Sequence, residues 1–188
     1  MLDRRDFVAQ LLVERGDLLV ICGLGSATYD VAAAGDHPLN FYLWGAMGGT
    51  AMIGLGLALA RPDRRIAVIT GDGDMLMGMG SLATIGVKQP KNLAIMVLDN
   101  GHYGETGMQP SHTNAGIDLV AVALACRFKH ARAVSRIAEA ADARALLHAG
   151  EGPILVNAQI KPEDPPRVLP LRDGHAIKQR FIAALNPL

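Results

Sequence analysis

Short, almost purely apolar runs alternate along this chain with longer segments in which apolar residues recur at helical spacing. Runs at 17–22, 66–70, 93–99 and 153–160 predict buried strands, and FYLW at 41–44 predicts another that ends at Gly45. Helices are expected at 3–15, 26–34, 48–60, 75–87, 117–126, 135–149 and 176–185, with Ser26 as the N-cap of the second. This alternation predicts a doubly wound α/β fold, in which helices cover both faces of a mainly parallel sheet.

The segment 48–60, GGTAMIGLGLALA, contains no charged residue and is rich in glycine. Glycine weakens an exposed helix by about 1 kcal/mol per residue, so we expect this helix to be buried and pressed closely against the sheet. The length of 188 residues suits one domain, and we assign 1–188 to a single domain with 161–188 as a proline-containing tail.

Composition narrows the possible classes of function. Lys plus Arg and Asp plus Glu number 18 each, which leaves no net charge to attract nucleic acid or an anionic membrane. The two cysteines, Cys22 and Cys126, cannot build a disulfide framework or a cysteine-rich metal site. The N-terminus lacks the apolar region of a signal peptide, and no apolar run is long enough to span a bilayer. We therefore expect a cytoplasmic protein.

Acidic and amide side chains follow two predicted strands at the points where these strands end. Gly71-Asp72-Gly73 follows the strand at 66–70, and Asp99-Asn100 ends the strand at 93–99. Ligands of doubly wound sheets bind outside the carboxyl ends of the strands, so both segments should reach one rim. Carboxylate and amide oxygens suit Mg²⁺ or Ca²⁺, and the glycines let backbone N–H groups approach an anion. A metal carrying phosphate groups is the expected ligand.

GDG at 71–73, followed by Asn100 at a distance of 28 residues from Asp72, resembles the cofactor motif of thiamine diphosphate enzymes. The resemblance implies that Mg²⁺ is bound by the side chains of Asp72 and Asn100 and by the backbone carbonyl of His102. It also implies a diphosphate site with these members: Gly73, Asp74, Tyr103 and Gly104. Position 74 is often Ser or Ala in the family, so the Asp74 carboxylate must turn away from the diphosphate or be screened by the metal.

Upstream segments extend the resemblance. Gly45-Ala46-Met47-Gly48 is similar to the family segment in which a large apolar side chain separates the two rings of the cofactor. Met47 would take that place, and the Gly45 carbonyl would accept from the aminopyrimidine, although a Met between strand and helix is more often core filler. Gly25 and Ser26 are expected to approach the diphosphate, because the glycine pattern at 23–25 is too incomplete for a dinucleotide site.

Within this family the chain most resembles the beta subunit of sulfopyruvate decarboxylase and the C-terminal half of phosphonopyruvate decarboxylase. The segments that carry the likeness lie at 40–62, 71–86 and 98–109, and Ala46, Glu105 and Met108 depart from the usual residues. The resemblance implies a lyase that decarboxylates a 2-oxo acid, sulfopyruvate in the first instance, to an aldehyde. Phosphonopyruvate decarboxylation and acetolactate-type carboligation remain alternatives.

The family also needs a glutamate from a pyrimidine-binding domain to activate the cofactor. None of the five glutamates of this chain belongs to such a domain, so we expect a separate alpha subunit to supply it. No catalytic residue is assigned here, and His102 and His112 are the candidates because imidazole titrates near neutral pH. A non-catalytic module that binds thiamine diphosphate is the alternative of another class, whereas the lack of cysteine clusters disfavours an iron–sulfur oxidoreductase.

Overall fold

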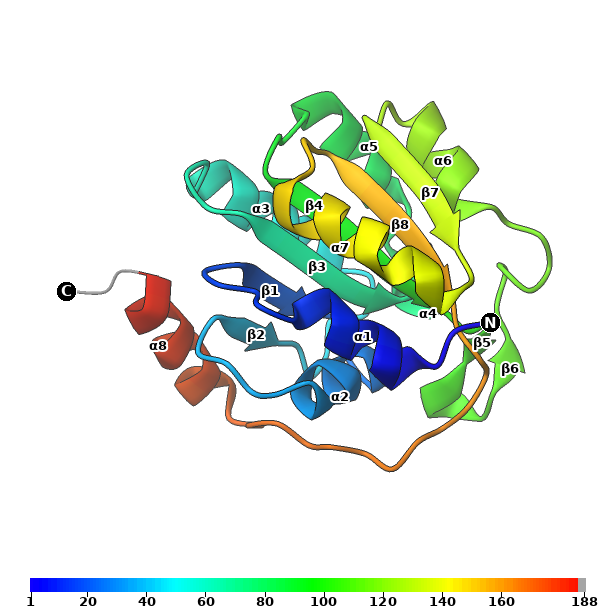
Figure 1. The fold of residues 1–188 in the computed structure, drawn as a ribbon, viewed down its shortest axis with the longest axis horizontal. Coiled ribbons are helices and arrows are strands. Elements are labelled where there is room, and N and C mark those ends of the chain that lie inside the picture. The colour runs from blue at the N-terminus through cyan, green and yellow to red at the C-terminus, as the bar shows by residue number, and fades with distance from the viewer. Residues whose placement is uncertain (186–188) are drawn as a thin grey trace.

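Six parallel strands form the centre of the protein in a computed structural model that describes residues 1–185 (Figure 1). Their order across the sheet is β2-β1-β3-β4-β8-β7. The chain starts in the middle and adds strands on both sides, so the sheet is doubly wound, as predicted, with its switch point between β1 and β3. The strands span Leu19–Cys22 (β1), Asn40–Tyr42 (β2), Ile66–Gly71 (β3), Leu93–Asp99 (β4), His130–Val134 (β7) and Ile154–Gln159 (β8).

Helices cover both faces of the sheet, as the uninterrupted apolar character of β3 and β4 requires (Figure 1). One face carries α1 (Arg4–Leu12), α2 (Ser26–Ala33) and α7 (Ala140–Ala149), and the other carries α3 (Thr50–Ala60), α5 (Gly80–Lys88) and α6 (Leu119–Ala125). Each face has its own hydrophobic core. No helix within residues 1–185 has the length and apolar character needed to cross a bilayer.

The glycine-rich helix α3 lies against the sheet on one side only. A Cβ at Gly54 would stand 2.3 Å from the Val68 side chain, which explains why a glycine is needed for this close approach. The opposite side of the helix exposes Met52, Ile53 and Leu59 to solvent. The predicted close contact with the sheet is therefore confirmed, while the predicted burial holds only for the side of the helix that faces the sheet.

The helix expected at 75–87 is divided into α4 (Asp72–Met77) and α5. The break falls at Gly78, where a Cβ would stand 2.1 Å from the carbonyl oxygen of Gly48, so the loop at 45–49 occupies the space beside the helix. The N-cap predicted for α2 is also wrong, because Gly25 precedes the helix with φ 72° and no side chain caps it. Ser26 is instead the first helical residue.

Two further differences concern the second half of the chain. The edge strand β7 was not predicted, because HARAV is polar and mostly exposed, and this strand displaces the start of the following helix to Ala140, after a 3₁₀ turn at Ile137–Glu139. The segment 100–116 contains the small antiparallel pair β5 (His102–Tyr103) and β6 (Gln109–Pro110), joined by a 3₁₀ turn, Gly104–Thr106. This pair lies at the same end of the sheet as α4 (Figure 1).

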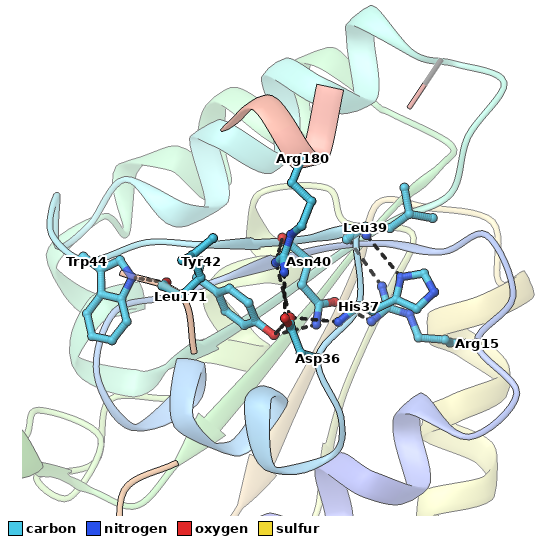
Figure 2. Close-up of polar contacts among 9 residues, drawn as sticks. All are labelled: Arg15, Asp36, His37, Leu39, Asn40, Tyr42, Trp44, Leu171 and Arg180. Carbon is cyan, nitrogen blue, oxygen red and sulfur yellow. Dashed lines mark hydrogen bonds and ion pairs between the residues drawn. The ribbon is translucent and has the colours of Figure 1, made fainter. Parts of the chain in front are cut away.

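The C-terminal segment runs from the end of β8 across the molecule to α8 (Gly174–Leu185), which packs beside β2 (Figure 1). Phe181 inserts into the core and meets Phe41 edge to face. Figure 2 shows the polar contacts that hold this segment: Arg180 pairs with Asp36, and the indole nitrogen of Trp44 donates to the Leu171 carbonyl at 3.0 Å. The predicted tail is thus packed against the domain through residue 185.

Candidate functional site

A cavity of about 510 Å³ opens where β1, β3 and β4 end. Its position beside the switch point of the sheet is where doubly wound folds bind ligands. Most of the residues predicted for a cofactor and a metal meet in its wall. The lining residues that the sequence predicted are Ser26, Met47, Asp72, Gly73, Asp74, Asn100, His102, Tyr103, Gly104 and His112.

Asp72, the first residue of α4, is 2% exposed. Its Oδ2 accepts a hydrogen bond from the hydroxyl of Ser111 at 2.5 Å and lies 3.2 Å from the Thr113 hydroxyl, whose single proton is closer to Asp99, and this leaves Oδ1 for another partner. Burial raises the pKa of Asp72, and the nearby negative charge of Asp99 raises it further. A buried carboxylate in this position is one that a bound cation would stabilise.

Asp99 continues this hydrogen-bond network behind Asp72. Its Oδ1 accepts from Thr113 at 2.8 Å and from the backbone N–H of Gly101 at 3.0 Å, and its Oδ2 accepts from Asn157 of β8 at 2.8 Å. Neither Asp72 nor Asp99 has a Lys or Arg partner within residues 1–185. Two carboxylates therefore share a buried network whose donors are all neutral.

Asn100 and His102 form a tight local turn at the end of β4. The Asn100 side-chain oxygen accepts from the backbone N–H of His102 at 2.9 Å, and the His102 ring nitrogen Nδ1 lies 2.8 Å from the Asn100 carbonyl oxygen. Because a carbonyl can only accept, Nδ1 is the donor in this contact. The turn holds the Asn100 amide beside the cavity, where its oxygen still has one lone pair to offer.

Asp74 lines the cavity, but its carboxylate is turned into the structure. It accepts from the hydroxyl of Thr70 through Oδ2 and from the backbone N–H of Gly48 through Oδ1. The conflict expected between this carboxylate and a diphosphate is thus avoided, since the side chain ties β3 and α4 to the loop that carries Met47. Gly23 is part of the same arrangement, because a Cβ there would meet Thr70 at 2.4 Å and Asp74 at 3.2 Å.

Met47 and Tyr103 converge on Gly73 from opposite segments of the chain. A Cβ at Gly73 would lie 2.7 Å from the Tyr103 ring and 3.2 Å from the Met47 methyl, so glycine is required for this approach. Met47 stands between two left-handed residues, Ala46 at φ 58° and Gly48 at φ 89°. The strained turn presents Met47 at the cavity with 39% of its surface exposed, which is unlike a core filler.

The remaining predicted residues lie at or near the mouth of the cavity. The Tyr103 hydroxyl is 3.0 Å from Nδ1 of His112, and both side chains line the wall. Gly25 and Gly45 do not line it: Gly25 lies against Glu105, which pairs with Arg167 at 3.4 Å, and Gly45 is exposed on the loop before Met47. The structure therefore brings together all but these two glycines.

The donor set of this rim fits a hard divalent cation and a phosphate-bearing ligand. Asp72 offers a carboxylate oxygen, Asn100 an amide oxygen, and Gly73 provides backbone approach at the start of α4, which has no side-chain cap. No group of three or more His, Cys, Asp or Glu suited to a metal occurs among the described residues, so a zinc-type site is not present there. The rim suits a metal that takes its other ligands from phosphate and water.

Sequence reasoning missed several residues on which this geometry depends. Ser111, Thr113 and Asn157 hold the two buried carboxylates, Thr70 and Gly48 hold Asp74, and Arg4 lines the cavity from α1. Gly48, Ser111 and Asn157 are separated from the carboxylates that they contact by 26 to 58 residues along the chain. No local sequence pattern could therefore indicate these contacts.

Comparisons with known proteins agree with this geometry. The family model "Thiamine pyrophosphate enzyme, C-terminal TPP binding domain" matches residues 23–158. Sulfopyruvate decarboxylase subunit beta of Methanothermobacter thermautotrophicus is 37% identical over 182 residues, which cover 97% of this chain and 95% of that protein. Phosphonopyruvate decarboxylase of Streptomyces viridochromogenes is 41% identical over 146 residues, which cover 78% of this chain but only 36% of that protein.

The fold also matches solved structures. The thiamine diphosphate-dependent 4-hydroxybenzoylformate decarboxylase of Rhodococcus jostii RHA1 superposes with a TM-score of 0.65 at 20% identity, covering 85% of this chain and 33% of that one. At that identity the likeness establishes the architecture alone. The chain thus spans about a third of the larger proteins that it matches and nearly the whole of the smaller one.

Proposed function

This chain belongs to the thiamine pyrophosphate enzymes, as their C-terminal cofactor-binding domain, and from that premise we propose that it is the beta subunit of a 2-oxo acid decarboxylase. Sulfopyruvate, converted to sulfoacetaldehyde and CO₂, is the proposed substrate, because the relative that matches along nearly its entire length is a sulfopyruvate decarboxylase subunit. The observation that carries the proposal is that Asp72 and Asn100 line the same cavity. Beside them, Met47 and Tyr103 converge on Gly73.

Thiamine diphosphate and Mg²⁺ are the proposed ligands of this cavity. Asp72, the Asn100 amide and the His102 carbonyl would hold Mg²⁺, and the backbone of Gly73 and Asp74 would face the diphosphate, with Ser26, Tyr103 and Gly104 around it. The cofactor supplies the electron sink that accepts the electrons left when a 2-oxo acid loses CO₂. Gly25 and Gly45, outside the cavity wall, are proposed to shape the adjoining loops.

The protein's own part is to bind and orient. Asp74 fixes the Met47 loop against α4 through Gly48, so that the apolar side chain keeps its place beside Gly73. Tyr103 closes over the same glycine and is held by His112. We assign neither His102 nor His112 a proton-transfer step, because the His102 ring is bonded to the Asn100 carbonyl and His112 to the Tyr103 hydroxyl.

An alpha subunit that binds the pyrimidine end and provides the activating glutamate is proposed as the partner. The matched relatives from Methanothermobacter and Methanocaldococcus are themselves named subunit beta. Beside the cavity, α3 and the α4–α5 segment contact each other and expose large apolar side chains of the kind that mark protein interfaces. They are Met52, Ile53, Met77 and Met79, each at least 37% exposed. A cytoplasmic location stays a prediction.

The decisive experiment measures Mg²⁺-dependent binding of thiamine diphosphate by calorimetry in the wild type and in Asp72→Asn. Loss of the carboxylate charge should weaken binding by at least about 100-fold, because an amide oxygen at this position is a neutral and much weaker ligand for Mg²⁺. Asp142→Asn, an exposed acid on α7, is the matched control and should bind as the wild type does. Equal affinity in Asp72→Asn and the wild type would contradict the proposed metal site.

Substrate choice needs a separate assay. The chain, reconstituted with its alpha subunit, should release CO₂ faster from sulfopyruvate than from phosphonopyruvate or pyruvate. Faster CO₂ release from phosphonopyruvate would indicate a phosphonopyruvate decarboxylase. Carboligation without aldehyde release would indicate an acetolactate-type enzyme. Cofactor binding without turnover of any 2-oxo acid would identify a non-catalytic module.

A further inference from the structure

Arg4, the first residue of α1, is the one Lys or Arg in the described wall of the cavity. Its side chain is only 6% exposed, and its Nε donates to Asp30 of α2 at 2.6 Å. Within residues 1–185 the structure records no other polar partner for this guanidinium. An arginine has five N–H donors, so the terminal nitrogens of Arg4 remain for a ligand.

The placement of Arg4 runs against the local electrostatics of its own helix. The N-terminus of a helix carries partial positive charge and disfavours cations, yet α1 begins with Arg4 and Arg5. Asp3 caps this helix and Asp6 lies in its first turn, but the recorded partner of the Arg4 side chain within residues 1–185 is Asp30. Burying a guanidinium is also unfavourable unless it is paired and hydrogen-bonded throughout. Local rules are most often broken at functional sites, where a ligand restores the balance. An anion bound in the cavity would offset both costs.

The neighbours of Arg4 in the cavity wall also favour an anion. Ser26 and Ala27 form the N-terminus of the eight-residue helix α2, which has no side-chain cap. The Ser26 hydroxyl lies 4.0 Å from where a Cβ of Gly104 would be, so this helix start faces the loop proposed to close over the diphosphate. Orphan N–H groups at a helix start and an arginine beside them make a suitable environment for phosphate.

The surrounding charges leave this corner of the cavity positive. Asp30 is 1% exposed and is approached by two arginines, Arg4 at 2.6 Å and Arg5 at 3.7 Å. Asp164 lines a small hollow behind them but is exposed, so solvent screens its charge. Glu105 also lines the cavity, but its charge is paired with Arg167. Two cations therefore face one buried carboxylate.

We propose that Arg4 binds the diphosphate of the cofactor, with Asp30 as the residue that positions its guanidinium. The inference rests on the proposed function and adds a second anchoring point, on α1, to the one at the start of α4. It predicts that Arg4 recognises the phosphate groups and makes no contribution to binding of the rings. A substrate anion is the other oxyanion that could meet Arg4, and the experiment separates the two.

The test needs a variant that removes the cation without leaving a buried carboxylate unpaired. Burial already raises the pKa of Asp30 despite its arginine partners, so Arg4→Gln alone would leave this group without its main partner. The double variant Arg4→Gln/Asp30→Asn carries no charge at either position and leaves neither partner as a buried unpaired ion. Comparing it with Asp30→Asn isolates the effect of the cation, as in a double-mutant cycle. Circular dichroism and thermal unfolding verify that each variant is folded.

Calorimetry with the full chain and Mg²⁺ should show thiamine diphosphate binding weakened about 10- to 100-fold in the double variant relative to Asp30→Asn, as expected for lost charged hydrogen bonds. Competition by inorganic pyrophosphate should weaken in parallel, whereas competition by thiamine, which lacks phosphate, should not change. Arg136→Gln is the matched control, because Arg136 is exposed and lies outside the cavity wall, and it should stay within about twofold.

Each contrary result has a distinct meaning. Unchanged affinity for thiamine diphosphate in the double variant refutes the inference, and if the KM of the 2-oxo acid rises instead, Arg4 serves the substrate. Equal weakening of thiamine and of thiamine diphosphate indicates a purely structural residue and also refutes it. A wild type that binds no thiamine diphosphate would overturn the proposed function as well, whereas binding that depends on Asp72 but not on Arg4 would overturn the inference alone.

Discussion

Two networks of polar side chains lie at opposite ends of the sheet, and their charges are balanced in different ways. At the carboxyl ends of β3 and β4, Asp72, Asp74 and Asp99 accept hydrogen bonds from hydroxyl, amide and backbone donors only. Before β2, at the amino ends, Asp36 accepts from both terminal nitrogens of Arg180, and Arg15 donates to the Asn40 side chain (Figure 2). We call these the rim network and the anchor network.

The difference indicates which network is complete as it stands. In the anchor network a cation faces the carboxylate, and the contacts join β2 to α8 without any need for a ligand. In the rim network three largely buried carboxylates lie at or beside the cavity. None of them has a Lys or Arg partner in the described chain. Buried negative charge without compensation is unfavourable, and a bound cation is the natural remedy. The anchor network therefore stabilises the fold by itself, and we propose that a bound cation completes the rim network.

The largest effect should come from breaking the rim network at Asp74. In Asp74→Ala the Thr70 hydroxyl and the Gly48 N–H lose their acceptor, and we expect a loss of about 1–3 kcal/mol in the free energy of unfolding, measured with urea. The loop that carries Met47 should loosen as well, so thiamine diphosphate binding should weaken by at least about tenfold.

Asp63→Asn provides the control for this prediction, because that carboxylate is exposed and bonds to the neighbouring Arg61. It should leave both quantities within experimental error. A second comparison, Met47→Leu, keeps an apolar side chain at the turn and should retain most of the affinity that Asp74→Ala loses. If Asp74→Ala binds the cofactor as tightly as the wild type, Asp74 does not position the Met47 loop.

A smaller effect distinguishes the two networks directly. Mg²⁺ alone should stabilise the wild type, because binding to the native state at ten times its dissociation constant adds about 1.4 kcal/mol. For a chain of this size the thermal midpoint should rise by about 3–5 °C. Asp72→Asn should abolish this rise, whereas Asp36→Asn in the anchor network should retain it. A rise that survives in Asp72→Asn would place the cation elsewhere.

Much of the rim could be predicted from sequence because it follows from the ends of two strands. The run LAIMVLD defines β4 and IAVIT lies within β3, and parallel strands deliver their carboxyl ends to one edge. That Asp72 and Asn100 lie at the same edge can then be predicted without knowledge of tertiary contacts. The predicted fold class and the family resemblance depended on these same segments, and both are confirmed.

What could not be predicted depends on contacts between distant segments. Ser111 reaches Asp72 only because the β5–β6 pair folds back over the cavity, and the direction of the Asp74 side chain is decided by Gly48. The edge strand β7, with one buried residue and two exposed ones, carries little apolar signal and exists because β8 offers a free edge for pairing. Arg4 joins the cavity through the packing of α1 on α2, which no spacing along the chain encodes.

The smallest effect is expected from breaking the anchor network at Arg180. Arg180→Gln removes the ion pair with Asp36 and the contact over the Tyr42 ring, both only partly buried. We expect a loss of no more than about 1 kcal/mol, concentrated in faster hydrogen exchange of α8. Lys178→Gln, an exposed change on the same helix, is the matched control, and the affinity for thiamine diphosphate should not change in either variant.

The pH dependence of the same anchor sharpens this prediction. Partial burial works to raise the pKa of Asp36, but hydrogen bonds from Arg180 and Tyr42 outweigh it, and the pKa lies below its ordinary value. A lowered pKa means that the stabilisation is fully present above the ordinary value of about 4 and is lost as the pH falls through the lowered pKa. Protection of α8 should therefore be constant from about pH 7 to pH 5 and decline only in stronger acid. Protection that falls between pH 7 and pH 5 would assign the effect to a group other than Asp36. Protection that Arg180→Gln leaves unchanged would show that apolar packing around Phe181 holds the helix without the ion pair.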